Sequence, residues 1–265
     1  MPSKQPSAES LIRISDALLP VIRQAGIAIL ALYHKPEHAI QIKADASPVT
    51  DADLVSHDLL LDALSRITPD WPVISEEDVV HHHCEKLSID DPQYAVNPSW
   101  LLDPLDGTKE FIGRSGEFCI SLGLVVNRRA HFGLIYGPVE GVCYRGGGGV
   151  AAQKHLPGGQ WERIAARTRP ADGGVLISSR RSRATPEHEK FARHDHLGSA
   201  LKFGRLAEGL ADYYLRRGPT MEWDTCAGQA ILESAGGRVT TLDQEQLRYG
   251  KPEFRNPGFI ATGIY

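Results

Sequence analysis

Two aspartates, Asp103 and Asp106, end an apolar stretch and are separated only by Pro104 and Leu105 in the segment WLLDPLDGT. Two buried carboxylates at one site raise each other's pKa unless a cation neutralises them. A bound metal ion would supply that charge, and all-oxygen ligands favour Mg²⁺, with Mn²⁺ as a substitute. Pro104 restricts the backbone so that both aspartates can face one side of the turn, and the Leu105 carbonyl can supply another oxygen. The segment therefore predicts a magnesium site.

The residues after the second aspartate are suited to phosphate. Gly107 lets the backbone approach a ligand closely, and the amides of Gly107 and Thr108 at a helix start can donate to a phosphate oxygen. Haloacid-dehalogenase-type phosphatases carry their aspartates in a D-x-D pattern, whereas Asp103 and Asp106 are three positions apart. The spacing disfavours a covalent aspartyl-phosphate, and the turn is expected to hold metal and phosphate together.

Three further acidic segments have side chains of the same chemistry. SPVTDAD places Asp53 at the start of a helix, SEED places Glu76 at the end of a strand, and EWDTCAGQ places Asp224 at another helix start. Taken alone, Asp224 is explained as an N-cap and Asp53 as a first-turn acid favoured by the helix dipole, and the acids that follow Glu76 are explained as solvated loop charge. In combination with the aspartate pair, they favour a shared metal site.

The elements expected to position these acids alternate along the first half of the chain. Apolar residues from Leu11 to Leu32 keep a helical period, which Pro20 should kink or split. A polar loop at 43–50 precedes a second helix that ends before Pro69. Short strands at 72–74 and 100–102 both end on acid, and an antiparallel meander follows from Glu117 to about 153.

The second half of the chain changes pattern after a crossover at 162–174. It predicts a strand at 175–179, helices at 186–194 and 200–210, and a strand at 212–216. A last helix has Asp224 at the N-cap position and Gly236 as its C-terminal stop. The four glycines from Gly146 to Gly149 lack the rest of a phosphate-loop motif and are interpreted as a mobile hairpin tip. We expect subdomains at 1–165, with an extension at 1–20, and at 166–265.

Composition limits the partners and the location. A formal net charge of -4 gives no basic face for a nucleic acid polymer. The four cysteines are far apart and form no C-x-x-C pair, so neither zinc nor a disulfide framework is indicated. We expect no signal peptide and no transmembrane segment, hence a cytoplasmic protein; weak peripheral membrane association stays open, as does the choice between monomer and homodimer.

Taken together, these motifs resemble the inositol-monophosphatase-like, lithium-sensitive phosphatase superfamily. The similarity rests on DPLDGT at 103–108, on WD and GG at 223–224 and 236–237, on EE at 76–77 and on TDAD at 50–53. The segments VISEED, GSALKFGRLAEGLADYYLR and NPGF are most similar to 3'(2'),5'-bisphosphate nucleotidases of the CysQ type. Lys109 stands where inositol monophosphatases usually carry Asn, which also favours the nucleotidases.

The resemblance implies a fold and an activity. The fold would be a layered α-β-α-β-α sandwich of the inositol monophosphatase and fructose-1,6-bisphosphatase type, α+β in class, with the active site between two subdomains. The activity would be Mg²⁺-dependent hydrolysis of the 3'-phosphate of adenosine 3',5'-bisphosphate, or of its sulfated form, by direct attack of a water that the metal activates. Lithium would inhibit it.

The resemblance also implies roles for individual residues. Two Mg²⁺ ions, with a third and weaker one near Asp53, would be held by Glu76, Asp103, the Leu105 carbonyl, Asp106 and Asp224. The residues expected to activate water are Asp53, Glu76 and Thr108. The expected substrate-binding residues are Glu76, Leu105, Asp106, Gly107, Thr108, Ser199, Lys202, Arg216 and Asp224. Within that set, Lys202 and Arg216 would bind the 5'-phosphate.

Several alternatives remain open at this stage. The same chemistry could act on an inositol phosphate or on fructose 1,6-bisphosphate, and a non-catalytic nucleotide sensor would not need Thr108 and Asp53. Arg180, Arg181 and Arg183 could join an anion pocket but are left unassigned, as are residues 1–20. The segment His81–Cys84 is expected to be a polar loop, because adjacent residues cannot all face one metal ion.

Overall fold

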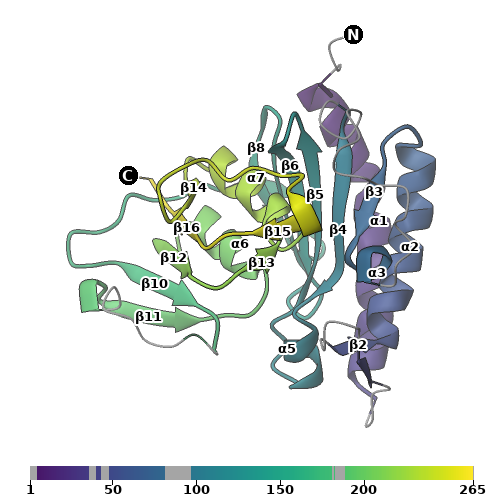
Figure 1. Cartoon of the computed structure of the whole chain (residues 1–265), viewed down its shortest axis with the longest axis horizontal. Helices are drawn as coiled ribbons and strands as arrows, with labels where there is room; N and C mark the ends of the chain where they lie inside the picture. Colours follow the sequence, from purple (N-terminus) through teal and green to yellow (C-terminus); the bar gives the residue numbers. More distant parts are fainter. Residues whose placement is uncertain are drawn as a thin grey trace.

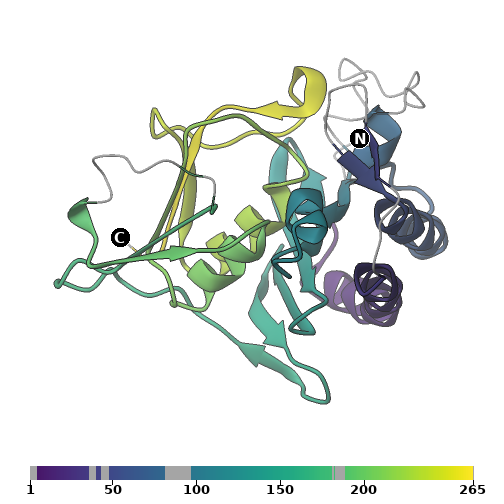
Figure 2. The same ribbon diagram turned by 90° about the horizontal axis from the view of Figure 1, so that it is seen from below.

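The computed structural model describes residues 5–35, 40–42, 48–80, 97–180, 182 and 189–264. Four layers are stacked in these residues (Figures 1 and 2). Helices α1 (Ala8–Tyr33) and α2 (Asp51–Ile67) cover one face of a seven-stranded sheet, and α6 (Leu201–Ala207) and α7 (Cys226–Ser234) lie between this sheet and a five-stranded one. The predicted layered α/β architecture is therefore confirmed for these four layers.

The seven-stranded sheet is antiparallel except at its first pair. Its order is β3 (Val73–Ser75), β4 (Ser99–Asp106), β5 (Cys119–Val126), β6 (Arg129–Gly137), β7 (Val142–Gly147), β8 (Val150–His155) and β9 (Trp161–Arg163), with β3 parallel to β4. The expected meander is present. Two short helices extend from the ends of strands in this sheet: α3 (Glu76–Val80) and α5 (Thr108–Ile112).

The five-stranded sheet belongs to the second half of the chain. Its order is β11 (Arg193–His196), β10 (Val175–Ser178), β12 (Tyr213–Arg216), β16 (Phe259–Thr262) and β14 (Arg238–Thr241). Two ribbons complete the described structure, namely β1 (Ile40–Ile42) with β2 (Pro48–Thr50), and β13 (Thr220–Met221) with β15 (Arg255–Asn256), which follows the short 3₁₀ helix η2 (Pro252–Phe254). The division at residue 165 stays a prediction.

Helix α1 is one continuous element that contains Pro20, so of the expected kink or split at this proline, the split does not occur. Pro20 is exposed, so water can serve the carbonyl that loses its backbone partner. The helix begins at Ala8 and therefore includes most of the expected extension at 1–20. Leu11 and Leu18 in this part are fully buried. The helix also has the length and composition of a membrane span, contrary to expectation, but its buried face belongs to the protein core.

The core has two parts, one on each face of the large sheet. Residues on the two faces of β5 contribute to the two parts: Ile120 and Leu122 pack toward α1 and α2, and Cys119 packs toward α6 and α7. Helix α7 lies directly on the sheet, because a Cβ on Gly133 would come within 2.2 Å of the carbonyl oxygen of Ala227. This close packing fixes the start of α7, where one predicted ligand lies.

Three local predictions need correction. Residues 193 and 194, the end of the helix expected at 186–194, form the start of β11, because they pair in parallel with β10 at the edge of its sheet. Residues 181 and 183–188 lie outside the described part of the chain. The end of the expected loop at 43–50 forms β2. The glycines at 146 and 147 continue β7, and only Gly148 and Gly149 form the turn. The segment His81–Cys84 lies outside the described residues.

Candidate active site

A β-bulge brings the two aspartates of β4 to the same face of the sheet. Asp103 pairs with Ser121 and Asp106 with Cys119, so three steps along β4 match two steps along β5, and the register shifts between them. In a regular strand, residues three apart point to opposite faces, and one extra residue restores the parity. The Asp103 carboxylate also accepts the Leu105 amide at 3.0 Å, which holds the bulge.

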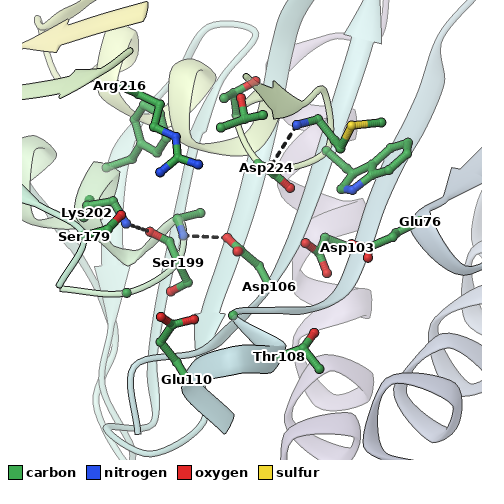
Figure 3. A pocket seen from close by; sticks show the side chains of 18 of the residues that line it. Glu76, Asp103, Asp106, Thr108, Glu110, Ser179, Ser199, Lys202, Arg216 and Asp224 are labelled. Atoms are coloured by element: carbon green, nitrogen blue, oxygen red, sulfur yellow. Dashed lines mark hydrogen bonds between the residues drawn. The ribbon is translucent and has the colours of Figure 1, made fainter. Parts of the chain in front are cut away.

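Glu76 and Asp224 reach this face from two other segments. Glu76 directly follows β3, whose last residue pairs with Leu102 of β4, so it lies beside Asp103. Asp224 precedes α7 and accepts the Met221 amide at 2.8 Å. The helix cap is Thr225, so the predicted N-cap role of Asp224 is wrong and its carboxylate faces the cleft instead (Figure 3).

Three of the predicted metal ligands form one cluster. Carboxylate oxygens of Glu76, Asp103 and Asp224 lie within 4.8 Å of one another (Figure 3). Such an arrangement of hard oxygen donors fits Mg²⁺ or Mn²⁺. Asp106 lies beside the cluster and accepts the Ala200 amide at 2.6 Å. The Leu105 carbonyl is 3.3 Å from the Thr108 hydroxyl.

Two carboxylates at this site, those of Asp106 and Asp224, are electrostatically unfavourable in their charged form without a cation. Burial raises the pKa of Asp106 to about 6, and the charge of Glu76 adds to the rise while Lys202 opposes it. Burial, followed by the charges of Asp106 and Glu76, raises the pKa of Asp224 well above its ordinary value. A divalent ion would relieve both effects, and this supports a metal at the cluster.

Metal binding should therefore stabilise the protein in a pH-dependent way. Because the folded-state pKa of Asp106 is raised from 3.8 to about 6, the stability of the metal-free protein falls as pH rises through that window. Mg²⁺ at about 100 times its Kd should raise the melting temperature by about 5 °C at a pH near 7.5 and much less near pH 5. Thermal denaturation of chelator-treated protein checks this, and equal shifts at both pH values would contradict it.

Thr108 and Asp53 meet at the edge of the cluster, as predicted. The Thr108 hydroxyl donates to Asp53 Oδ1 at 3.1 Å. The other oxygen, Oδ2, accepts the Thr50 amide at 2.8 Å and the Thr50 hydroxyl at 2.7 Å. These bonds form a capping box at the start of α2, so the motif TDAD both caps a helix and orients Asp53 toward Thr108.

The cluster lies at one side of a cleft of about 860 Å³. Residues of both halves line it, from Glu76 to Glu110 and from Ser179 to Phe259. Gly107 is among them, with φ of 100°, and a Cβ there would come within 3.2 Å of the Glu117 carbonyl oxygen. The positive φ and the close backbone contact thus explain why position 107 is a glycine.

The opposite side of the cleft is cationic (Figure 3). Lys202 is 3 % exposed, and its Nζ donates to the carbonyls of Ser199 at 2.6 Å and Leu197 at 3.1 Å. Burial lowers its pKa, which the charge of Asp106 opposes. Arg216 points into the cleft, and its Nε is buried without a hydrogen-bond partner in the described structure. An anion would satisfy that donor.

Sequence reasoning missed the rim of the cleft at Met221, Glu253 and Arg255. The signal was present in NPGF, whose Asn256 donates to the Met221 carbonyl at 2.8 Å and joins the two rim segments. It also missed the Ala200 amide at Asp106, which no side-chain pattern could reveal. The predicted site residues all line the cleft, except Asp53, which lies beside it in contact with Thr108.

Comparison with known proteins places the chain in a family. Residues 13–262 match the inositol monophosphatase family. The chain is 38% identical over 261 residues to the 3'(2'),5'-bisphosphate nucleotidase CysQ of Escherichia coli K12, covering 93% of this chain and 98% of that protein. It is 30% identical over 257 residues to the Haemophilus influenzae CysQ, covering 94% and 92%.

Solved structures agree with these sequence relatives. CysQ from Bacteroides thetaiotaomicron superposes with a TM-score of 0.76 at 34% identity, covering 95% of this chain and 98% of that one. An inositol monophosphatase from Anabaena superposes with a TM-score of 0.73 at 26% identity, covering 96% and 92%. The chain therefore belongs to the inositol monophosphatase family, and the predicted fold class is confirmed.

Proposed function

We propose that this chain is a Mg²⁺-dependent 3'(2'),5'-bisphosphate nucleotidase that converts adenosine 3',5'-bisphosphate to AMP and phosphate. The single observation that carries the proposal is the polarity of the cleft, with four carboxylates on one side and, on the other, buried Lys202 and half-buried Arg216, whose Nε is buried. A bisphosphate presents two anionic groups to match these two ends. The names of the CysQ relatives support the same assignment.

The carboxylates Glu76, Asp103, Asp106 and Asp224, with the Leu105 carbonyl, would hold two Mg²⁺ ions, and a third could bind weakly near Asp53. When bound, Mg²⁺ lowers the pKa of water and neutralises charge on the phosphoryl and leaving oxygens. The residues of the chain chiefly supply position, as is usual in phosphoryl transfer. Gly107 and Thr108 would donate their amides to the reacting phosphate.

Thr108 and Asp53 would handle the proton of the attacking water. The Thr108 hydroxyl already donates its hydrogen to Asp53 Oδ1, so its oxygen can accept a hydrogen from water. The water oxygen forms a bond to phosphorus while the bond from phosphorus to the 3'-oxygen breaks. The water proton passes toward Asp53 through Thr108 and Glu76 assists, and the 3'-oxygen takes a proton from solvent.

A phosphate-release panel tests the substrate assignment. Purified protein with Mg²⁺ should act faster on adenosine 3',5'-bisphosphate than on inositol 1-phosphate or fructose 1,6-bisphosphate. Faster release from either sugar phosphate would overturn the nucleotide assignment and favour the corresponding family activity. Tight nucleotide binding in calorimetry without any phosphate release would instead indicate a sensor.

Arg216 should control selectivity for the second phosphate. Its buried Nε has no hydrogen-bond partner among the residues that the structure describes, so Arg216→Ala should reduce kcat/KM for adenosine 3',5'-bisphosphate by about 10- to 100-fold. The rate with adenosine 3'-monophosphate, which lacks the 5'-phosphate, should change little. Steady-state kinetics with both substrates measures this, and Arg217→Ala is the matched control, because Arg217 is exposed. Equal losses on both substrates would contradict the assignment.

A cytoplasmic location and the choice between monomer and homodimer stay predictions. We propose no nucleic acid polymer as a partner, since the net charge of -4 offers no basic footprint. The partner of the cleft would be a small nucleotide bisphosphate.

A further inference from the structure

An ion pair beside the cleft joins the two sheets. Glu117 lies just before β5 of the large sheet, and Arg180 lies just after β10 of the five-stranded sheet. Arg180 Nε donates to the two carboxylate oxygens of Glu117 at 3.0 Å and 2.9 Å, and Nη2 donates to the same group. The Glu117 side chain is 11% exposed and the Arg180 side chain 57%. An ion pair with an arginine this exposed contributes little to the stability of the fold, so stability alone does not explain the pair.

The buried partner, Glu117, also holds a turn formed by residues 197–200. Its Oε2 accepts the buried amide of Gly198 at 3.0 Å. A Cβ on Gly198 would come within 2.3 Å of the Glu117 carbonyl oxygen, so the turn is pressed against both the backbone and the side chain of Glu117. The orientation of the Glu117 carboxylate, which Arg180 fixes through a bidentate pair, therefore sets the position of this turn.

The turn in its place supports both sides of the cleft. The amide of Ala200 donates to Asp106 Oδ2 at 2.6 Å, on the metal side. The carbonyls of Leu197 and Ser199 accept Lys202 Nζ, on the cationic side. Ser199 has φ of 51°, a left-handed conformation that is strained for serine and persists only where its surroundings hold it. Relaxation of the turn would therefore move Asp106, a proposed metal ligand, together with Lys202, a proposed contact of the substrate.

We propose that Arg180 and Glu117 are positioning residues that fix the turn at 197–200, and thereby tune both metal affinity and nucleotide binding. This inference rests on the proposed function, because it takes Asp106 as a metal ligand and Lys202 as a nucleotide contact. The rival interpretation is that Arg180 binds a substrate anion directly. Ser179 and Gly198 are among the described residues that line the cleft, and Arg180 is not among them, which favours the positioning role.

The two interpretations differ in the absence of substrate. We expect Arg180→Ala and Glu117→Gln each to weaken Mn²⁺ binding to the substrate-free protein by roughly 3- to 10-fold in calorimetry, and also to raise KM for adenosine 3',5'-bisphosphate. Because Arg180 and Glu117 act as one unit, the double variant should bind Mn²⁺ as tightly as whichever single variant has the lower Mn²⁺ affinity. Arg180→Lys should recover only part of the loss, since lysine cannot form the bidentate pair.

Arg193→Ala is the matched control. Arg193 is a 63% exposed arginine paired with Asp195 on β11, in the same sheet, and its variant should bind Mn²⁺ and substrate like the wild type. Melting temperatures in metal-free buffer verify that each variant is folded. If Glu117→Gln fails to fold, the exposed Arg180 still allows the test.

Two results would overturn the proposal. A rise in KM for Arg180→Ala with wild-type Mn²⁺ affinity would show that Arg180 contacts the substrate directly. Unchanged Mn²⁺ affinity and unchanged KM would show that the ion pair does not position the turn. A failure of the proposed function is distinguishable, because the wild type itself would then release no phosphate from the nucleotide while the Mn²⁺ measurements would still report on the ion pair.

Discussion

Asp224→Asn is expected to lower kcat for phosphate release by about a thousandfold or more, because it removes one of three carboxylates that converge on one spot. The change keeps the size of the side chain and its acceptor for the Met221 amide. The lost charge weakens the metal site directly. Phosphate release measured over a range of Mg²⁺ concentrations checks this, and added Mg²⁺ should recover only part of the rate.

Loss of the fold can be separated from loss of the metal in this variant. Burial and the neighbouring acids raise the pKa of Asp224, so its ionised form destabilises the metal-free fold. Metal-free Asp224→Asn should therefore melt at or above the wild-type temperature near pH 7.5. Asp243→Asn, at an exposed turn, is the control and should be fully active. A wild-type rate in Asp224→Asn at limiting Mg²⁺ would refute its role as a ligand.

Thr108→Ala is expected to lower kcat by about a hundredfold and to leave KM for the nucleotide nearly unchanged. The hydroxyl lies between Asp53 and the cleft, so its loss interrupts the proposed path of the water proton. The variant keeps the amide and the capping box at Thr50, which are independent of this hydroxyl. Steady-state kinetics at saturating Mg²⁺ separates the two constants.

Thr108→Ser provides the matched control, because serine retains the hydroxyl without the methyl group. It should keep most of the wild-type kcat. If Thr108→Ala raised KM alone, Thr108 would be a binding residue, and the proposed role in proton transfer would be wrong.

The acidic residues of the site were predictable because each one lies at the boundary of an element with a strong local signal. Glu76 follows a short apolar strand, Asp53 lies in a TxxD cap, and Asp224 precedes an apolar helix that ends at Gly236, whose φ is 97°. Such patterns depend on neighbours in sequence. These local patterns predicted the order of the elements, and the layered fold was implied by the family resemblance.

The features that the sequence did not reveal depend on contacts distant in the chain. The bulge in β4 is defined by its pairing with β5, and without it Asp103 and Asp106 would face opposite sides. The polar strand β11 exists because β10 offers an edge to pair with. The Ala200 amide reaches Asp106 across 94 residues, and a backbone donor leaves no mark in composition. Helix α1 continues through Pro20, so a proline inside a helical pattern did not end the helix here.

The proposed function requires that carboxylates from distant segments converge to bind the divalent metal ions at which phosphate is released. A crystal soaked in Mn²⁺ and measured for anomalous scattering tests it most directly. We predict a strong anomalous peak contacting Glu76, Asp103 and Asp224, with Asp106 beside it. Peaks only at other sites, or these carboxylates turned away from one another in the crystal, would show that these residues do not form a metal site.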